Sequence, residues 1–422
     1  MKSLTISCKN QTIKGEITLS GSKSISNRAL LIRALCEEHF EIHNLSDSDD
    51  TVTMENLLNS NSDVLDAHHA GTTFRFLTAY LSTQDGTHVL TGSERMQQRP
   101  IKALVDALNF LGADITYIKN EGYPPLKISS HNTVWKNDIT LPANISSQYI
   151  TALLLIAPTL PDGLTIRLEG EIVSKPYIEM TLGMMDYFGV KVITDWQNQM
   201  ISISHQAYVA KDFFVEADWS AASYYYIIAG LSKSTDIVLH GLQEDSLQGD
   251  AAIAQIGRKF GVETVFGNKS IRIVKDEKAN IPEFFEYDFI KEPDIAQSVS
   301  VLCAGLGVNA LFTGLQTLRI KETDRIAALQ NELQKIGVFI TKMPAKFSKK
   351  TGVEYYMQEG KAVIEQGDAP VFETYNDHRM AMAFAPLGLV GNVGINDPNV
   401  ISKSYPNYWK DLIKLGFQME TN

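Results

Sequence analysis

A pattern that recurs along the 422 residues constrains the fold more than any other feature of this chain. A polar opening leads into an apolar helix, and a second apolar helix ends at a glycine before a predicted strand. The openings recur at intervals of roughly 70 to 80 residues, at 69–76, 144–151, 216–223, 292–299 and 374–381. The second helices are predicted to end at Gly112, Gly189, Gly261, Gly337 and Gly416. We therefore expect one unit of two helices and several strands to be repeated.

Six copies of this unit are predicted. Residues 21–28, GSKSISNR, open a shorter first copy, and its second helix, near residues 51–58, lacks the glycine stop. A chain of 422 residues is too long for one ordinary core, so two domains are expected. Six copies divide into two domains of three.

The domain boundary is placed where the third copy ends, because no stretch of the chain has the composition of a linker. We expect one domain to contain residues 21–216 and the other to contain 217–422 together with 1–20. The first strand, 4–19, could pair with either half. Each copy puts a polar helix start at the same place, so helix N-termini should converge in a cleft between the domains. The alternative is a solenoid whose repeats serve only for packing.

The charge of the chain limits its partners. There are 38 Lys and Arg residues against 49 Asp and Glu residues, a net charge of −11. Nucleic acid and anionic membranes are therefore not expected as partners. Anionic substrates would require positive charge to be gathered locally, and seven of the 11 arginines lie in the polar motifs. These are Arg28, Arg75, Arg95, Arg99, Arg319, Arg325 and Arg379.

Cysteine and histidine usage predicts neither a disulfide framework nor a metal site. Cys8, Cys36 and Cys303 form no close pair, and His68 and His69 are adjacent rather than spaced as ligands on a helix. The N-terminal segment lacks an apolar run typical of a signal peptide, and no apolar run is long enough to span a bilayer. We expect a soluble, cytoplasmic protein.

The first opening is suited to an anion. Ser22, Ser24 and Ser26 can cap a helix whose first backbone N–H groups lack intrahelical partners. Lys23 would add a cation beside this helix end, and Arg28, four residues after Ser24, would project from the same side. The alternative is an ordinary capped helix with two solvated cations.

Further donors follow in the next copies. Gly71 allows close approach of the backbone, and Arg99 stands directly before Pro100, at the predicted start of a helix with proline in its first turn. Arg99 would then lie at the positive end of the helix dipole. Uncharged donors suited to a phosphate or to hydroxyl groups are Ser146, Ser147, Gln148 and Ser174.

The fifth and sixth copies carry acid–base groups. The spacing places Lys321 and Arg325 one turn apart on a helix, with Glu322 beside them. Cations at a helix start are unfavourable unless an anion is bound there. The alternative is a solvated, charged helix face, which would show the same spacing of charged residues. Asp294 is either a helix cap or a functional carboxylate, and Asp377, His378 and Arg379 precede an apolar helix. Together these residues predict a site for two small anionic molecules with acid–base groups between them.

These motifs resemble those of the EPSP synthase family. GSKSISNRAL, AGTTFR, RPIKALVDAL, SSQ, VSKPYIEMTL, PDIAQSV, LRIKETDRI, YNDHRMAMA and SKSYPNYW occur in the family's order and spacing, over essentially the whole chain. The resemblance implies transfer of the enolpyruvyl group of phosphoenolpyruvate to the 5-hydroxyl of 3-phosphoshikimate. The reaction proceeds through a tetrahedral intermediate and releases phosphate, in the shikimate pathway to chorismate and aromatic amino acids.

The resemblance also implies a fold and a set of functional residues. The fold is the two-domain α/β enolpyruvyl transferase fold, each domain having three copies of a βαβαββ unit, with the active site in the interdomain cleft. Catalysis is implied for Asp294 as acceptor of the hydroxyl proton, for Glu322 at the methylene carbon, and for Lys23 and His378. Contacts to 3-phosphoshikimate are implied for Lys23, Ser24, Arg28, Ser146, Ser147, Gln148, Ser174, Asp294 and Lys321. Contacts to phosphoenolpyruvate are implied for Lys23, Gly71, Arg99, Gln148, Arg325, Arg379 and Lys403. We expect a monomer without cofactor or metal.

Three positions depart from the family's pattern. His69 stands where Asn or Asp is common, Phe76 where proline is frequent, and Thr317 where some members have a substrate-contacting Asn. Substrate affinity and sensitivity to glyphosate are the properties that these departures would affect.

Two other functions remain as alternatives. The enolpyruvyl transferase that acts on UDP-N-acetylglucosamine shares the fold and the donor, but it usually carries a reactive cysteine before its Arg-Pro helix. Residues 85–99 contain no cysteine. A non-catalytic sensor of anionic metabolites would not need both Asp294 and Glu322.

Overall fold

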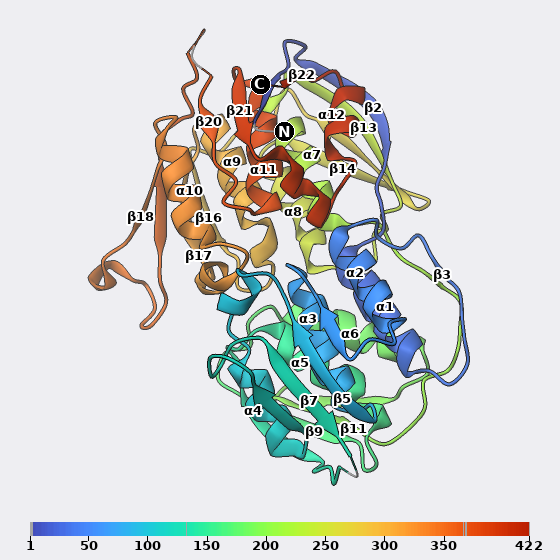
Figure 1. Ribbon diagram of the computed structural model, residues 1–422. Helices are drawn as coiled ribbons and strands as arrows, with labels where there is room; N and C mark the ends of the chain where they lie inside the picture. Colours follow the sequence, from blue (N-terminus) through green and yellow to red (C-terminus); the bar gives the residue numbers. More distant parts are fainter. Residues whose placement is uncertain (1–2, 132, 366, 368, 422) are drawn as a thin grey trace. The chain divides into compact units, whose positions relative to one another are not determined.

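The computed structural model describes residues 3–131, 133–365, 367 and 369–421 (Figure 1). The chain forms two compact units: unit I is residues 21–215, and unit II is residues 1–20 with 216–422. The predicted division differs by one residue, at Glu216. The Glu216 carboxylate accepts hydrogen bonds from Trp219 Nε1 at 2.9 Å, Gln243 N at 3.1 Å and Gln248 Nε2 at 2.8 Å, all within unit II.

Unit II contains three four-stranded sheets with one topology. Across each sheet the strands of a copy lie in the order first, second, fourth, third. The first and second strands are parallel, and the fourth is antiparallel to both of its neighbours. The fourth copy comprises β2 (Thr12–Thr18), α7 (Trp219–Leu231), β13 (Ser234–His240), α8 (Ile253–Arg258), β14 (Val262–Gly267) and β15 (Ser270–Lys275). The fifth comprises β16 (Phe284–Asp288), α9 (Ala296–Leu306), β17 (Asn309–Thr313), α10 (Arg325–Gln334), β18 (Phe339–Lys342) and β19 (Tyr356–Glu359). The sixth comprises β20 (Val371–Phe372), α11 (His378–Phe384), β21 (Val393–Asn396), α12 (Tyr408–Lys414), β22 (Gln418–Thr421) and β1 (Ser3–Ser7).

The N-terminal segment forms two strands, so the prediction of a single strand over residues 4–19 was wrong. Strand β1 lies between β21 and β22, antiparallel to both, whereas β2 pairs in parallel with β13. Between them the Asn10 side chain accepts a hydrogen bond from Thr12 N at 3.0 Å, a local turn that redirects the chain. The segment therefore completes both the fourth and the sixth copy of unit II.

Unit I repeats the same topology twice and contains one reduced copy. The reduced first copy comprises α1 (Lys23–Leu35), β3 (Ile42–His43) and α2 (Asp49–Leu58), and its strand pairs in parallel with β12 (Phe213–Phe214). The second copy comprises β4 (Val64–Asp66), α3 (Gly71–Leu81), β5 (Gly86–Thr91), α4 (Lys102–Leu111), β6 (Asp114–Tyr117) and β7 (Leu126–Ser130). The third comprises β8 (Asp138–Pro142), α5 (Ser147–Ile156), β9 (Leu164–Glu169), α6 (Lys175–Tyr187), β10 (Val192–Asp195) and β11 (Met200–Ile203).

The glycine stops are confirmed. All five glycines predicted to follow the second helices have positive φ, between 72° and 125°, a conformation that residues other than glycine rarely adopt. One helix start was wrong: α4 begins at Lys102, so Pro100 precedes the helix and is not in its first turn.

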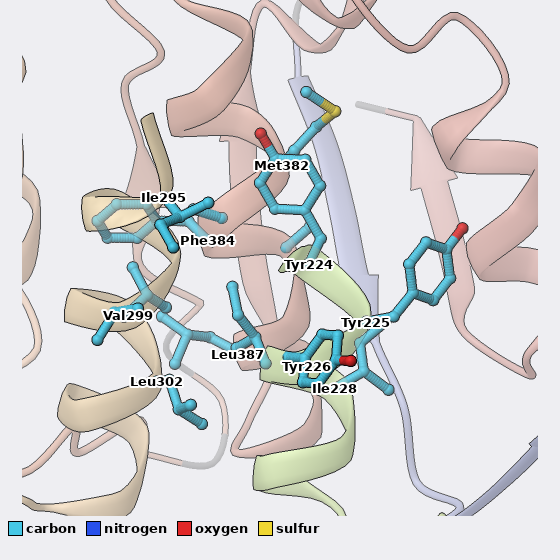
Figure 2. Packing of buried hydrophobic residues seen from close by; sticks show 14 of the residues in the cluster. Tyr224, Tyr225, Tyr226, Ile228, Ile295, Val299, Leu302, Met382, Phe384 and Leu387 are labelled. Atoms are coloured by element: carbon cyan, nitrogen blue, oxygen red, sulfur yellow. The ribbon is translucent and has the colours of Figure 1, made fainter. Parts of the chain in front are cut away.

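The first helix of each copy forms the centre of its unit. In unit II, α7, α9 and α11 pack on one another, and in unit I, α1, α3 and α5 do the same. Helix α7 is apolar around its circumference and buried, as a central helix must be. Figure 2 shows Tyr224 and Ile228 of α7, Val299 and Leu302 of α9 and Phe384 of α11, which belong to one cluster of buried hydrophobic residues. Each helix contacts both others rather than only a neighbour in sequence, which excludes a solenoid within each unit.

Among the described helices, none combines the length and the apolarity that crossing a lipid bilayer requires.

Candidate functional site

Arg379 joins the starts of the three central helices in unit II. Its Nη1 donates to the backbone oxygen of Asp294 at 2.9 Å, in the turn before α9. Its Nη2 donates to Ser220 Oγ of α7 at 3.2 Å and lies 3.3 Å from Asp294 Oδ2. The predicted convergence of polar helix starts is thus confirmed within this unit. We call Asp294, Lys321, Glu322, Arg325, Asp377 and Arg379 cluster II.

Asp294 lies among three cations. Its Oδ1 is 3.3 Å from Lys321 Nζ and 3.0 Å from Arg325 Nη1, and its Oδ2 faces Arg379. Burial by itself would raise the pKa of this carboxyl, but Arg379, Lys321 and Arg325 outweigh it and hold the pKa well below its usual range. The carboxylate caps neither adjacent helical segment, so the alternative of a simple helix cap was wrong.

Arg325 is enclosed by carboxylates. Its side chain is 2% exposed, its Nε donates to Asp377 Oδ2 at 2.8 Å, and its Nη2 donates to Glu322 Oε2 at 2.8 Å. With Asp294 on Nη1, three carboxylates share one guanidinium. This arrangement fixes the positions of two predicted acid–base residues, Asp294 and Glu322, relative to each other.

The predicted placement of Lys321 on a helix was wrong. Helix α10 begins at Arg325, and Lys321 precedes it. The Asp324 side chain caps the helix by accepting from Ile326 N and Ala327 N, both at 3.1 Å. The protein's own carboxylates therefore compensate the cation at this helix start, and the dipole argument for a bound anion does not hold here.

The other predicted residues of unit II lie at the start of α11. Asp377 Oδ1 caps the helix by accepting from Arg379 N at 2.9 Å, and His378 is its buried first residue. Lys403 is buried, and its Nζ donates to the backbone oxygen and to Oδ1 of Asn376, both at 2.6 Å. Asn376 therefore fixes the position of this ammonium group.

Asp250 is a buried carboxyl that the sequence did not indicate. It lies in the helical turn Gly249–Ala252, and its Oδ2 accepts a hydrogen bond from Ser220 Oγ. The same hydroxyl oxygen accepts a hydrogen bond from Arg379 Nη2. Burial and the charge of Asp294 raise the pKa of Asp250 to about 7. No motif marks this residue, because its importance arises only from its tertiary neighbours.

In unit I, Lys23 lies at the start of α1 and pairs with Asp50. The Lys23 Nζ to Asp50 Oδ2 distance is 3.3 Å, and Thr73 of α3 donates to the Asp50 backbone oxygen at 2.9 Å. His69, one of the departures from the family's pattern, places Nε2 3.7 Å from Asp50 Oδ1. The sequence reading missed Asp50, although the acidic run at the start of α2 was a signal.

Arg28 is buried beneath the start of α1. Its Nη1 donates to the backbone oxygen of Ser24 at 2.8 Å, and its Nε donates to Thr181 Oγ1 at 2.9 Å. Its guanidinium carbon lies 5.6 Å from the ring centre of Phe76, so the second departure provides a cation–π contact to a predicted ligand residue. Burial lowers the pKa of Arg28 to about 10, which leaves the cation intact at neutral pH.

Arg99 is a buried guanidinium over the start of α3. It is 6% exposed, and within the described ranges it has neither an ion pair nor a hydrogen bond to a side chain, with Nε fully enclosed. A Cβ atom at Gly71 would lie 2.5 Å from Arg99 Nη1, so only glycine leaves room for the guanidinium. Arg75 positions this segment by donating to the Gly71 oxygen at 3.0 Å and the Pro100 oxygen at 3.3 Å.

The predicted uncharged donors lie at two other helix starts. Gln148 of α5 donates from Nε2 to Thr72 Oγ1 of α3 at 3.1 Å, which links these helices near Gly71. Ser146 caps α5, Ser147 is its first residue, and Ser174 precedes α6 in a left-handed conformation, with φ 56°. We call Lys23, Ser24, Arg28, Gly71, Arg99, Ser146, Ser147, Gln148 and Ser174 cluster I.

Two motif arginines lie on the surface, and one departure from the family's pattern has a buried hydroxyl group. Arg319 is on the surface, where its Nη2 is 2.6 Å from Glu354 Oε2, and Arg95 is exposed near Gln98. The third departure, Thr317, has its hydroxyl buried without a hydrogen-bond partner among the described residues. Across those same residues, no three His, Cys, Asp or Glu side chains are placed to hold a metal ion.

Comparison with known proteins gives a consistent result. Residues 8–60 and 55–412 match the model of the family described as EPSP synthase (3-phosphoshikimate 1-carboxyvinyltransferase). A 3-phosphoshikimate 1-carboxyvinyltransferase from Bacteroides fragilis is 49% identical over 407 residues, 96% of each chain. The protein of the same name from Photobacterium profundum is 36% identical over 443 residues, covering 98% of this chain and 99% of the relative.

The fold has solved counterparts. The 2.37 Å structure of EPSP synthase from Acinetobacter baumannii matches over 100% of both chains, with a TM-score of 0.76 at 21% sequence identity. This likeness concerns the fold, and the sequence relatives above carry the family assignment.

Proposed function

We propose, from the premise that this chain belongs to the EPSP synthase (3-phosphoshikimate 1-carboxyvinyltransferase) family, that clusters I and II together carry out the family's reaction. The substrates are phosphoenolpyruvate and 3-phosphoshikimate. The 5-hydroxyl oxygen of 3-phosphoshikimate bonds to C2 of phosphoenolpyruvate while C3 gains a proton. The tetrahedral adduct then loses phosphate from C2 and a proton from C3, which leaves the enolpyruvyl ether.

Cluster I is proposed to bind the anionic groups. Arg99 supports this role most directly, because burying a guanidinium without a carboxylate partner costs free energy unless an anion binds to it. Gly71 permits its position, and Lys23 supplies a second cation at the start of α1. Helices α1 and α3 have no side-chain cap, so their first N–H groups also favour an anion. Ser24, Arg28, Ser146, Ser147, Gln148 and Ser174 are proposed to contact 3-phosphoshikimate.

Cluster II is proposed to move the protons. Asp294 accepts the hydroxyl proton, and Glu322 handles the proton at C3. The cations around Asp294 make it a weak base while no ligand is present. A substrate phosphate that shares Arg379, Lys321 and Lys403 would reduce their effect on Asp294 and raise its basicity when it is needed.

Two further residues are proposed to orient the reacting groups. Arg325, already bound by three carboxylates, holds Asp294 and Glu322 in place while contributing positive charge near phosphoenolpyruvate. His378, buried beside Asp377 and Arg379, assists in orientation. The observation that carries the proposal is the Asp294 carboxylate, 14% exposed and within 3.3 Å of three cations at converging helix starts.

We further propose that the protein acts as a monomer in the cytoplasm. Its three cysteines are free, as in a reducing compartment. Size-exclusion chromatography at low micromolar concentration tests the monomer.

A phosphate-release assay tests the reaction. Purified protein with phosphoenolpyruvate should release phosphate only when 3-phosphoshikimate is added, and mass spectrometry should find its enolpyruvyl ether. UDP-N-acetylglucosamine in the same assay is the matched acceptor control. Release with that acceptor instead would assign the chain to the other enolpyruvyl transferase, and release with neither would favour a non-catalytic binding protein.

A further inference from the structure

Asp250 has no part in the reaction described above, yet it lies against the cluster that performs it. The residue is 3% exposed, and its Oδ2 accepts from the Ser220 hydroxyl. Its Oδ1 is buried and, among the residues that the structure describes, has no hydrogen-bond partner. A buried carboxyl that uses one oxygen is poorly stabilised as an anion, and a proton would satisfy it.

The groups that face Asp250 have mixed charge. Arg379 of α11 attracts the ionised carboxylate, whereas Asp294, before α9, and Asp218, which caps α7, repel it. Tyr287 of β16 is also close enough to interact with its charge: burial and the hydrogen bond to Glu292 raise the pKa of this phenol most, and the charge of Asp250 adds a smaller increase. Burial is the largest influence on Asp250, with the charge of Asp294 next, and its pKa of about 7 means that both protonation states are populated at neutral pH.

A short chain of contacts connects Asp250 to the acid–base centre. Ser220 Oγ donates to Asp250 and accepts from Arg379 Nη2 at 3.2 Å, and the same Nη2 lies 3.3 Å from Asp294 Oδ2. When it is ionised, Asp250 adds a further carboxylate to Asp294, Glu322 and Asp377, which already contact Lys321, Arg325 and Arg379. Its negative charge opposes the approach of an anionic substrate.

We propose that Asp250 is a positioning residue that orients Arg379 through Ser220 and takes up a proton from solvent when an anionic substrate binds. The proton neutralises Asp250 while the substrate's charge is present, and it returns to solvent when phosphate leaves. Asp250 forms no bond to the substrate. The proposal rests on the proposed function for the identity of that substrate, but proton uptake on anion binding can be measured without turnover.

The first experiment counts protons directly. Isothermal titration of phosphoenolpyruvate, and separately of inorganic phosphate, at pH 7.5 in two buffers of different ionisation enthalpy gives the protons taken up on binding. The wild type should take up more protons than Asp250→Asn, which cannot titrate. The matched control, Asp245→Asn, changes an exposed aspartate of the preceding loop and should behave as the wild type. Equal uptake in the wild type and Asp250→Asn overturns the proposal, whether or not the protein is an enzyme.

The second experiment follows the KM for phosphoenolpyruvate from pH 6 to pH 9. Substrate ionisation is common to all variants, so the ratio of the Asp250→Asn KM to the wild-type KM isolates this residue. The ratio should fall about tenfold as Asp250 ionises in the wild type. Ser220→Ala, which removes the link, should raise KM without introducing this pH dependence. Thermal unfolding checks that the variants are folded. If they are and the ratio stays constant with pH, Asp250 has only a structural role and the proposal is overturned.

Discussion

The two clusters treat positive charge differently. In cluster II, Arg325 and Arg379 contact carboxylates directly, and aspartates cap α7, α10 and α11. In cluster I, Lys23 pairs with Asp50, but Arg28 contacts hydroxyl and carbonyl oxygens and Arg99 lies over the Gly71 backbone, with no carboxylate partner for either arginine among the described residues. Helices α1 and α3 begin without side-chain caps.

This difference indicates a division of labour. Cations held by neutral oxygens keep their attraction for an external anion, whereas cations shared with carboxylates set the positions and the pKa values of those carboxylates. Changes in cluster I should therefore act mainly on KM, and changes in cluster II mainly on kcat. The following predictions test that separation in order of expected effect.

The largest effect is expected from Asp294→Asn. The variant cannot accept the hydroxyl proton, so kcat should fall about 10³-fold, equivalent to about 4 kcal/mol in activation free energy. The amide keeps the shape of the side chain and removes one negative charge, so substrate binding should not weaken. Phosphate release and equilibrium titration measure the two quantities. A loss of binding equal to the loss of rate would contradict the division between the clusters.

The next effect concerns stability and pH. The pKa of Asp250 is raised from its usual 3.8 to about 7 in the folded protein, so the folded state binds this proton more tightly than the unfolded chain does. The resulting stabilisation is present below about pH 4 and is lost as pH rises through 7. Relative to the wild type, Asp250→Asn should therefore gain stability across that window, by at most about 1.4 kcal/mol per pH unit. Urea unfolding at several pH values measures this gain, and a pH-independent difference would refute it.

Gly71→Ala should produce a smaller change confined to binding. The new Cβ would lie 2.5 Å from Arg99 Nη1 and displace the flexible guanidinium, so the KM for phosphoenolpyruvate should rise about tenfold with little change in kcat. In an Arg99→Ala background the same substitution should have no further effect on KM, which makes the double-mutant cycle the control. An equal rise of KM in both backgrounds would mean that Gly71 acts independently of Arg99.

The smallest effect is expected from Arg319→Gln. This arginine belongs to the motif of Lys321 and Arg325, but its guanidinium pairs with exposed Glu354 on the surface. Exposed pairs contribute at most about 1 kcal/mol, so stability should change by less than that and the kinetic constants should remain those of the wild type. A kinetic defect comparable to that of Arg99→Ala would show that the motif in which an arginine stands predicts its function better than its location in the structure does.

The sequence alone determined the repeat, its helix ends and the family. Local signals suffice for these features: apolar periodicity defines a helix, and glycine at positive φ ends one, as at Gly112 and Gly337. The family's motifs extend over nearly the whole chain, so their order identified it. The sequence also named all six cations that the two clusters contain.

Only the tertiary structure decided how those charges are used. Asp50 and Asp250 lie against the clusters because the fold brings Lys23 and Ser220 next to them, and the sequence marks Asp50 only by an acidic run and Asp250 not at all. Arg325 and Arg319 look alike in one motif, yet one is enclosed by carboxylates and the other is on the surface. The physical reason is that pKa and anion affinity depend on burial and on charges within a few ångströms, which are set by residues far apart in the chain.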